Sequence, residues 1–155
     1  MCSDQLNNKT IEMIDVSRKP VIYRIAEAIG EINLKLSTID AIKKGQIKKG
    51  DVLTASKIVG ILAVKKTADI LPLCHSIPLQ QVNINFEFLN NNLKSHCVVS
   101  ANYKTGVEME ALVGVTTSLL NVWDMVKYLE KDDSGQYPDT VIKNIRVIKK
   151  WKKSI

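Results

Sequence analysis

The sequence is poor in the residues that build metal centres and disulfide frameworks. Its three cysteines, Cys2, Cys74 and Cys97, are odd in number and form no Cys-x-x-Cys motif, so neither a disulfide framework nor a zinc finger is predicted. Of the two histidines, His75 follows Cys74 in a segment expected to be extended, where neighbouring side chains point apart. The other, His96, has no carboxylate partner nearby in the sequence. We therefore predict no metal site.

The chain also lacks a long uncharged apolar run and an apolar N-terminal segment. The most apolar stretch, residues 111–127, carries charged residues near its end, so no membrane span is predicted. Residues 1–9 are polar, which predicts no signal peptide and a cytoplasmic location. A chain of 155 residues is long enough for one domain with a real core. We expect a flexible tail over residues 1–12 and a single domain over 13–155.

Positive charge exceeds negative charge, and the net charge is +6. Such an excess favours anionic partners such as nucleotides, phosphates or nucleic acid. Much of it lies in the C-terminal tail, so the net charge alone does not locate a binding site. The lysines of this tail are Lys149, Lys150, Lys152 and Lys153.

A long helix is predicted over residues 106–127. Residues 111–122 are mostly apolar on every side, which is typical of a buried helix. Thr105 and Glu108 have the spacing of a capping box, so the helix is expected to begin near Gly106. It would be roughly 22 residues and about 33 Å long.

Charged residues flank this apolar helix, with Glu108 and Glu110 in its first turn and Asp124 and Lys127 in its last. Taken singly, each has an ordinary surface explanation, such as a helix cap or an i,i+3 ion pair. Together they indicate a functional site. Glu108 and Asp124 are about 24 Å apart along the axis and lie on nearly opposite faces. If both ends serve one site, that site must be assembled from two subunits.

Shorter patterns complete the predicted fold. Ser37 and Asp51 are candidate helix caps, and residues 71–78, bracketed by two prolines, are expected to be extended or turning. Strands are predicted over residues 22–36, 82–88, 93–103 and 141–147, and the shorter helices over 37–45 and 51–66. This order predicts an α+β fold of the ferredoxin-like, split βαβ type, with a four-stranded antiparallel sheet and helices on one face. The other face would need cover, so self-association is expected.

Five separated motifs occur in the order of one known family. They are Ile14-Asp15-Val16-Ser17, Lys49-Gly50-Asp51-Val52, Leu71-Pro72-Leu73-Cys74-His75, Thr105-Gly106-Val107-Glu108-Met109-Glu110-Ala111-Leu112 and Trp123-Asp124-Met125-Val126-Lys127. Over residues 14–149 the chain resembles the cyclic pyranopterin monophosphate synthase family of molybdenum cofactor biosynthesis (protein C of that pathway). Residues 135–138, Gly-Gln-Tyr-Pro, are similar to its archaeal branch.

The resemblance implies a ferredoxin-like lyase of the phosphorus–oxygen class, with a catalytic domain over residues 13–155. Its substrate would be (8S)-3',8-cyclo-7,8-dihydroguanosine 5'-triphosphate, a cyclised dihydro-GTP, and its products cyclic pyranopterin monophosphate and diphosphate. It implies a homo-oligomer, a hexamer built as a trimer of dimers with the active site at a dimer interface. Neither nucleic acid nor a membrane is expected as a partner. No cofactor is expected, and a role for Mg²⁺ with the polyphosphate is left open.

The family match implies catalytic roles for three residues. Lys49 and Lys127 would transfer protons, which requires a lowered pKa if either acts as a base, and Asp124 would orient or tune Lys127. We further expect a composite pocket, in which one subunit supplies Lys49 and another supplies the Asp124 end of the long helix. Without the match, the simplest interpretation of Lys49 is a solvated loop charge.

The same match implies a substrate-binding set. Glu108 or Glu110 would accept N–H groups of the guanine-derived ring, and His75 would donate to a phosphate or ring oxygen. Lys65 would contact the triphosphate, with Arg24 a weaker candidate. The set comprises Leu73, Cys74, His75, Glu108, Met109, Glu110 and Lys65.

The C-terminal tail departs from the family pattern. Much of the family ends in Lys-x-Gly-Gly-Lys-Ser-Gly, whereas this chain has Lys-Lys-Trp-Lys-Lys over residues 149–153. Lys149 would keep the position of the first lysine, and no firm phosphate contact is predicted from the tail. Ser76 stands where a proline usually follows the histidine.

Two other functions are compatible with parts of the sequence. An RNA-binding module of the same strand order needs aromatic residues on its central strands, and the strand over residues 93–103 has only Tyr103, at its far end. A non-catalytic partner protein of the same family is the second alternative. The joint presence of the candidate residues at positions 49, 75, 110, 124 and 127 argues against it.

Overall fold

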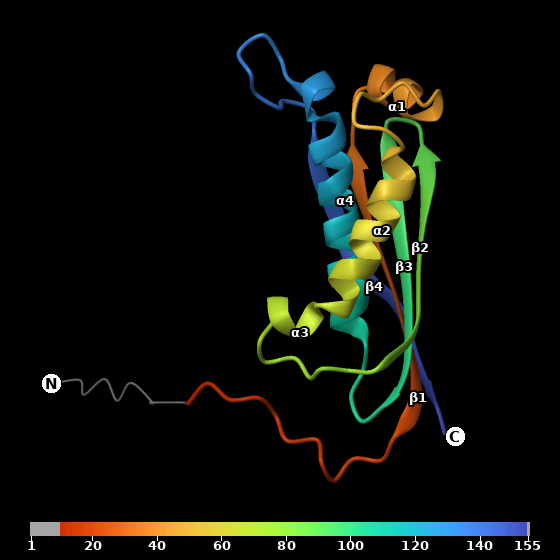
Figure 1. Cartoon of the computed structure of the whole chain (residues 1–155), viewed down its shortest axis with the longest axis vertical. Helices are drawn as coiled ribbons and strands as arrows, with labels where there is room; N and C mark the ends of the chain where they lie inside the picture. Colours follow the sequence, from red (N-terminus) through yellow and green to blue (C-terminus); the bar gives the residue numbers. More distant parts are fainter. Residues whose placement is uncertain (1–9, 155) are drawn as a thin grey trace, which may run out of the picture.

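The computed structural model describes residues 10–154 and contains a four-stranded sheet with helices on one face (Figure 1). The strand order is β2-β3-β1-β4, and every neighbouring pair is antiparallel. The predicted α+β, ferredoxin-like fold is confirmed. The predicted N-terminal tail lies largely outside the described residues, as does Cys2. The elements are β1 (Ile22–Asn33), α1 (Leu36–Lys43), α2 (Val52–Lys65), α3 (Thr67–Ile70), β2 (Leu79–Leu89), β3 (Asn92–Tyr103), α4 (Glu108–Glu130) and β4 (Val141–Lys153).

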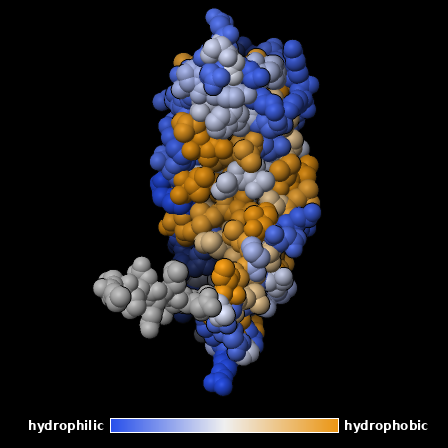
Figure 2. Space-filling view, turned by 90° about the vertical axis from the view of Figure 1, so that its left-hand side faces the viewer, coloured by the Kyte–Doolittle hydropathy of each residue, from blue (hydrophilic) through white to orange (hydrophobic). Residues whose placement is uncertain are grey.

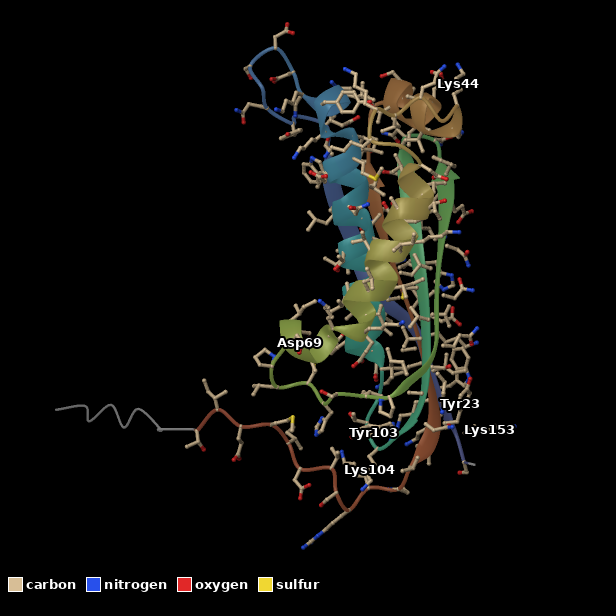
Figure 3. The ribbon with its side chains drawn as sticks, viewed as in Figure 1. Tyr23, Lys44, Asp69, Tyr103, Lys104 and Lys153 are labelled. Carbon is tan, nitrogen blue, oxygen red and sulfur yellow. The ribbon has the colours of Figure 1, made fainter. Side chains whose placement is uncertain are left out.

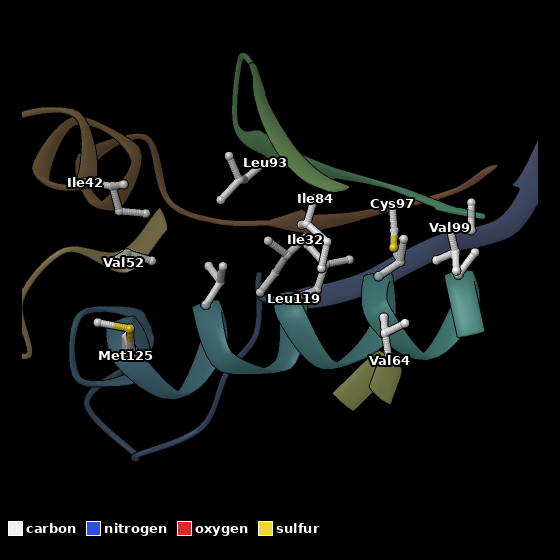
Figure 4. Close-up of a cluster of buried hydrophobic side chains, with 14 of the residues drawn as sticks. Ile32, Ile42, Val52, Val64, Ile84, Leu93, Cys97, Val99, Leu119 and Met125 are labelled. Carbon is white, nitrogen blue, oxygen red and sulfur yellow. The ribbon is translucent and has the colours of Figure 1, made fainter. Parts of the chain in front are cut away.

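The core lies between the sheet and α4, and strand alternation selects its residues. Ala26 and Ile32 of β1 and Cys97 and Val99 of β3 are fully buried on the face that the helices cover. Leu119 of α4 packs against them (Figure 4). The apolar positions that alternation predicted for β1 and β3 are therefore the core positions.

Helices α2 and α4 approach closely at two glycines. A methyl group on Gly114 would come 2.7 Å from Sγ of Cys97 and 2.7 Å from the side chain of Val64. A methyl group on Gly60 of α2 would come 3.1 Å from the carbonyl oxygen of Gly114. Because glycine has no Cβ, the two helices pack backbone against backbone at this point.

The helix ends differ in part from the prediction. Asp51 caps α2, since its Oδ1 accepts a hydrogen bond from the Thr54 backbone N–H at 3.0 Å. The predicted capping box of Thr105 and Glu108 is wrong, because α4 begins at Glu108 without a side-chain cap and continues to Glu130. The predicted Ser37 cap is also wrong, since α1 begins at Leu36 without one. Among residues 10–154, no helix is long and apolar enough to span a membrane.

The face of the sheet that the helices leave uncovered carries ion pairs. Nε2 of His96 lies 3.0 Å from a carboxylate oxygen of Glu27, and Nζ of Lys94 lies 2.9 Å from one of Glu87. Charged groups of this kind are satisfied in water. The expectation that this face is covered by self-association stays a prediction.

Large exposed apolar side chains lie on the helices instead. Ile58 and Leu62 of α2 are 55% and 53% exposed, and Leu120 of α4 is 58% exposed. Figure 2, which views the molecule from the side of α4, shows apolar residues gathered across its middle. An apolar patch of this extent is typical of an interface.

Strand β4 is longer than predicted. It continues past the expected end at Val147 to Lys153, and residues 149–153 pair with β1 from Tyr23 to Glu27. The basic tail is thus part of the sheet, and its side chains have fixed directions.

Candidate active site

A cavity of about 540 Å³ opens at the N-terminal end of α4. Four segments that are distant in sequence form its wall, so the cavity exists only in the folded chain. Six of the seven predicted substrate-binding residues line it: Leu73, Cys74, His75, Glu108, Met109 and Glu110. The sequence-based prediction did not include the other residues that line the cavity, among them Ile14, Val16, Lys19, Val147 and Lys150.

His75 anchors the N-terminal segment against this cavity. Its Nε2 atom lies 2.8 Å from the carbonyl oxygen of Ile14. Lys104 holds the same segment by donating from Nζ to the carbonyl oxygen of Ser17 at 2.7 Å. Figure 3 shows Lys104 and Tyr103 at this end of the molecule and Lys44 at the other. The motif at residues 14–17 therefore forms a wall of the cavity.

Glu110 is the buried carboxylate of the cavity. Its residue is 4% exposed. Burial raises the pKa of Glu110, and the nearby charge of Glu108 raises it further. Burial and the charge of Glu110 likewise raise the pKa of the Cys74 thiol, which keeps the thiol neutral. Glu110 is thus placed to accept hydrogen bonds from a bound ring.

Lys150 supplies a cation to the wall of the cavity. Its Nζ lies 2.7 Å from Oε1 of Glu108. Burial opposes ionisation of Glu108, but the hydrogen bond from Lys150, a backbone hydrogen bond and the charges of Lys150 and Arg24 together outweigh it, so the pKa of Glu108 is lowered. Of the two adjacent lysines, Lys150 lines the cavity, whereas Nζ of Lys149 lies over the Trp151 ring, 4.6 Å from its centre. That Lys149 keeps the position of the family's first lysine stays a prediction.

Two smaller cavities adjoin the first. One of about 330 Å³ shares His75 and Glu110 with it and is lined by Lys65, which places Lys65 behind this shared wall. The other, of about 200 Å³, lies beside the ion pair of Glu108 and Lys150 and is lined by Arg24. Nε of Arg24 donates to the Tyr103 carbonyl oxygen at 3.0 Å, which fixes the guanidinium at this edge.

The three predicted catalytic residues meet at the other end of α4. Nζ of Lys49 lies 2.6 Å from Oδ2 of Asp124, and Nζ of Lys127 lies 2.8 Å from Oδ1. These hydrogen bonds, from Lys127 first and then Lys49, lower the pKa of Asp124 to about 2. The carboxylate in turn raises the pKa of Lys127. A raised pKa keeps Lys127 protonated at neutral pH, which suits a proton donor or an anion ligand more than a base.

All three residues of this cluster belong to one chain. The prediction that Lys49 of one subunit faces Asp124 of another is therefore wrong. Within one chain the cluster is separate from the cavity, because Glu108 and Asp124 lie about 24 Å apart along α4.

One exposed face of α4 joins the two ends. Its residues recur at three- and four-residue spacing, so they share a side of the helix. Leu120 in the middle is 58% exposed, and Met109 at the cavity is 41% exposed. We call this set the α4 stripe: Met109, Val113, Thr116, Leu120, Asp124 and Lys127.

Between residues 10 and 154, no group of three or more histidine, cysteine, aspartate or glutamate side chains is arranged to hold a metal ion. The candidate site consists of cations, carboxylates and one histidine. Such a set can bind a nucleotide polyphosphate and move protons.

Known proteins resemble the chain over almost its whole length. A family model described as the MoaC family matches residues 13–152. A "probable cyclic pyranopterin monophosphate synthase" of Thermococcus kodakarensis is 54% identical over 147 residues, which cover 95% of this chain and 94% of the relative. One of Sulfolobus acidocaldarius is 52% identical over 140 residues, 90% of this chain and 98% of the relative. A "probable cyclic pyranopterin monophosphate synthase accessory protein" of Methanothermobacter thermautotrophicus is 49% identical over 146 residues, 94% of this chain and 92% of the relative.

Proposed function

The chain belongs to the MoaC family, and we propose that it converts a cyclised dihydro-GTP into cyclic pyranopterin monophosphate and diphosphate in molybdenum cofactor biosynthesis. The observation that carries the proposal is the pairing of a purine-sized cavity, with the buried carboxylate of Glu110, and a separate cluster of two ammonium groups on Asp124. The reaction rebuilds a purine-derived ring and expels diphosphate, so it needs hydrogen-bond acceptors for the ring, cations for the phosphates and proton donors.

In the cavity, Glu110 accepts N–H groups of the guanine-derived ring, because a carboxylate matches a pair of adjacent donors. His75 lies on the same wall and contacts ring or phosphate oxygens. Lys150 and Lys19 line the opposite side and neutralise the polyphosphate. Lys150 then exchanges its partner Glu108 for a phosphate oxygen.

Lys49 and Lys127 donate and relay protons while Asp124 orients both amines. The raised pKa of Lys127 favours its ammonium form, so this residue begins the cycle as an acid. It protonates the group that leaves the ring or the phosphate, and it regains its proton from solvent.

The active site is completed by a second copy of the chain. The α4 stripe has Met109 at one end and Asp124 and Lys127 at the other, with exposed Leu120 between them. If two copies pack this stripe antiparallel about a twofold axis near Thr116 and Leu120, the cavity of each copy faces the cluster of its partner. The apolar residues of α2 and α4 supply the buried area. Three such dimers give the hexamer, a trimer of dimers.

Turnover of the purified protein tests the proposal. Supplied with the cyclised dihydro-GTP, the protein should release diphosphate and cyclic pyranopterin monophosphate in equal amounts. Lys49→Ala and Lys127→Ala should each abolish turnover and leave the oligomer intact. Absence of a single turnover by correctly folded, oligomeric wild-type protein would overturn the proposal in favour of a non-catalytic partner. Full activity in either lysine variant would remove that lysine from the mechanism.

A further inference from the structure

The loop that carries Lys49 lies between α1 and α2 and is anchored at several points. Ile47 is 6% exposed and reaches into the core. The Gly50 N–H donates to the carbonyl oxygen of Ile47 at 3.0 Å, and Gly50 has a φ of +101°, which a residue with a side chain adopts only with strain. Asp51 then caps α2. These contacts fix both ends of the loop but leave Lys48 and Lys49 between them.

Tyr128 of α4 holds the residue next to Lys49. Its hydroxyl oxygen accepts a hydrogen bond from the Lys48 backbone N–H at 3.0 Å. Nζ of Lys48 also lies 5.3 Å from the centre of the Tyr128 ring, within the range of a cation–π contact. Tyr128 is one helical turn beyond Asp124, so the same stretch of α4 contacts both Lys48 and Lys49.

The contacts of Lys49 with Asp124 are exposed to solvent: its Nζ donates to Oδ2 at 2.6 Å and to the backbone carbonyl oxygen at 3.0 Å. The two side chains are 45% and 51% exposed. Exposed ion pairs contribute little because water competes and the long lysine side chain loses rotamer entropy when it is ordered. A fixed backbone at position 48 reduces the entropy lost when Lys49 is ordered on Asp124, because the Cα atom of Lys49 is then already held in place.

We propose that Tyr128 is a positioning residue: its hydroxyl fixes the loop at Lys48 so that the Lys49 ammonium stays on Asp124. The catalytic consequence of this role rests on the proposed function, while the positioning itself does not. Tyr128 need not touch the substrate, since it acts through the backbone of the loop.

Two readouts separate these statements. The first is the rate at which a limiting pulse of acetic anhydride acetylates Lys49 in the full-length protein, measured by mass spectrometry against the exposed Lys44 as internal reference. An amine held by the Asp124 carboxylate and backbone carbonyl meets the reagent less often than a freely moving amine, so it acylates slowly. The second is the split between kcat and KM in the turnover assay.

Tyr128→Phe removes the hydroxyl and keeps the ring. Acetylation of Lys49 should accelerate about fivefold, the factor for one hydrogen bond, and kcat should fall by about the same factor with little change in KM. Lys48→Ala removes the cation–π contact but keeps the backbone N–H, so acetylation of Lys49 should stay near the wild-type rate. Tyr23→Phe, at the far end of β1, serves as the matched control.

An unchanged rate of Lys49 acetylation in Tyr128→Phe would overturn the proposal, whatever the activity. So would equal acceleration in Lys48→Ala, because the ammonium contact and not the hydroxyl would then hold the loop. If acetylation accelerates as expected but Lys49→Ala retains full turnover, the positioning stands and the catalytic role of Lys49 in the proposed function fails.

Discussion

Nζ of Lys49 lies 2.6 Å from Oδ2 of Asp124 within the same chain. The residue numbers of this pair are 75 apart, so the fold and not local sequence brings them together. Lys127 shares the carboxylate, which leaves the cluster with one excess positive charge. A cluster with a net positive charge attracts anions such as phosphate, and this cluster forms within a single chain.

Mixed oligomers test how the two ends of α4 cooperate. Lys49→Ala and Glu110→Ala disable the cluster and the cavity separately. If the site combines one end from each copy, a mixed dimer has one intact site, and random exchange of equal amounts should restore about a quarter of wild-type activity. Diphosphate release after verified subunit exchange measures this.

The control for this experiment is a mixture of the Lys49→Ala and Asp124→Ala variants. Both residues belong to one cluster in one chain, so each mixed dimer lacks an intact site and activity should stay at the level of the separate variants. Recovery in this mixture, or none in the mixture of Lys49→Ala with Glu110→Ala, would refute the antiparallel arrangement.

The charge of Asp124 sets the titration of Lys127. The pKa of Lys127 is raised by Asp124, so the amine loses its proton only at a pH above the usual lysine range. Asp124→Asn removes that charge and should move the titration of Lys127 to lower pH. The alkaline limb of any residual kcat profile should move the same way. NMR of isotope-labelled lysine across a pH series measures the titration directly.

Asp40→Asn is the control for that shift, because Asp40 pairs with Lys44 in another exposed ion pair away from the cluster. It should leave the titration of Lys127 unchanged. If Lys127 titrates at the same pH in Asp124→Asn as in the wild type, the hydrogen bond between the two residues does not persist in solution.

Leu120 tests the α4 stripe as a contact between copies. In a single chain this side chain is 58% exposed, so Leu120→Glu should barely change the stability of the protomer. At a twofold axis the same change places two carboxylates close together in an apolar contact, which should dissociate the oligomer and abolish turnover. Sedimentation velocity measures the assembly, with the exposed Gln80→Glu on β2 as control. An unchanged oligomer in Leu120→Glu would exclude the stripe from the interface.

Glu130 tests the anchoring of the loop over residues 131–140. Its side chain is fully buried and accepts hydrogen bonds from the Lys35 backbone N–H at 3.2 Å and from Oγ1 of Thr140 at 2.5 Å. Glu130→Ala leaves both donors without an acceptor and should lower the free energy of unfolding by about 1–3 kcal/mol. Urea denaturation measures it. Thr140→Val breaks one of the two bonds and should cost less, and equal stability of all three proteins would show that these bonds are replaced by water.

Much of the fold could be predicted because strand alternation and helix amphipathicity are local. The alternation of Ala26, Ala28 and Ile32 identified the buried face of β1, and Asp51 identified the start of α2. The five motifs identified the family and most of the cavity wall. The cap of α4 was not predictable, since Glu108 pairs with Lys150, a partner that only the folded sheet brings close.

The identity of the cavity lysine depended on a bulge. Ala28 pairs with Val147, but Glu27 pairs with Lys149, so Ile148 is an extra residue in β4. Had the strand been regular, Lys149 would lie on the same face as Val147. The extra residue reverses the alternation and turns Lys150 to that face. In a tail made mostly of lysines, the sequence alone does not show that the strand register shifts by one residue.

Helix α4 runs from Glu108 to Glu130 without a break and is pressed against α2 at Gly114. The length of α4 therefore sets the distance between the cavity at its N-terminal end and the cluster of Lys49, Asp124 and Lys127 near its C-terminal end. Each residue inserted into or deleted from α4 would rotate the cluster relative to the cavity by about 100° about the helix axis and change their separation by about 1.5 Å. Active proteins with this fold that differ in chain length should therefore have their insertions and deletions in the turn over residues 131–140, where these change neither the rotation nor the separation of the two sites.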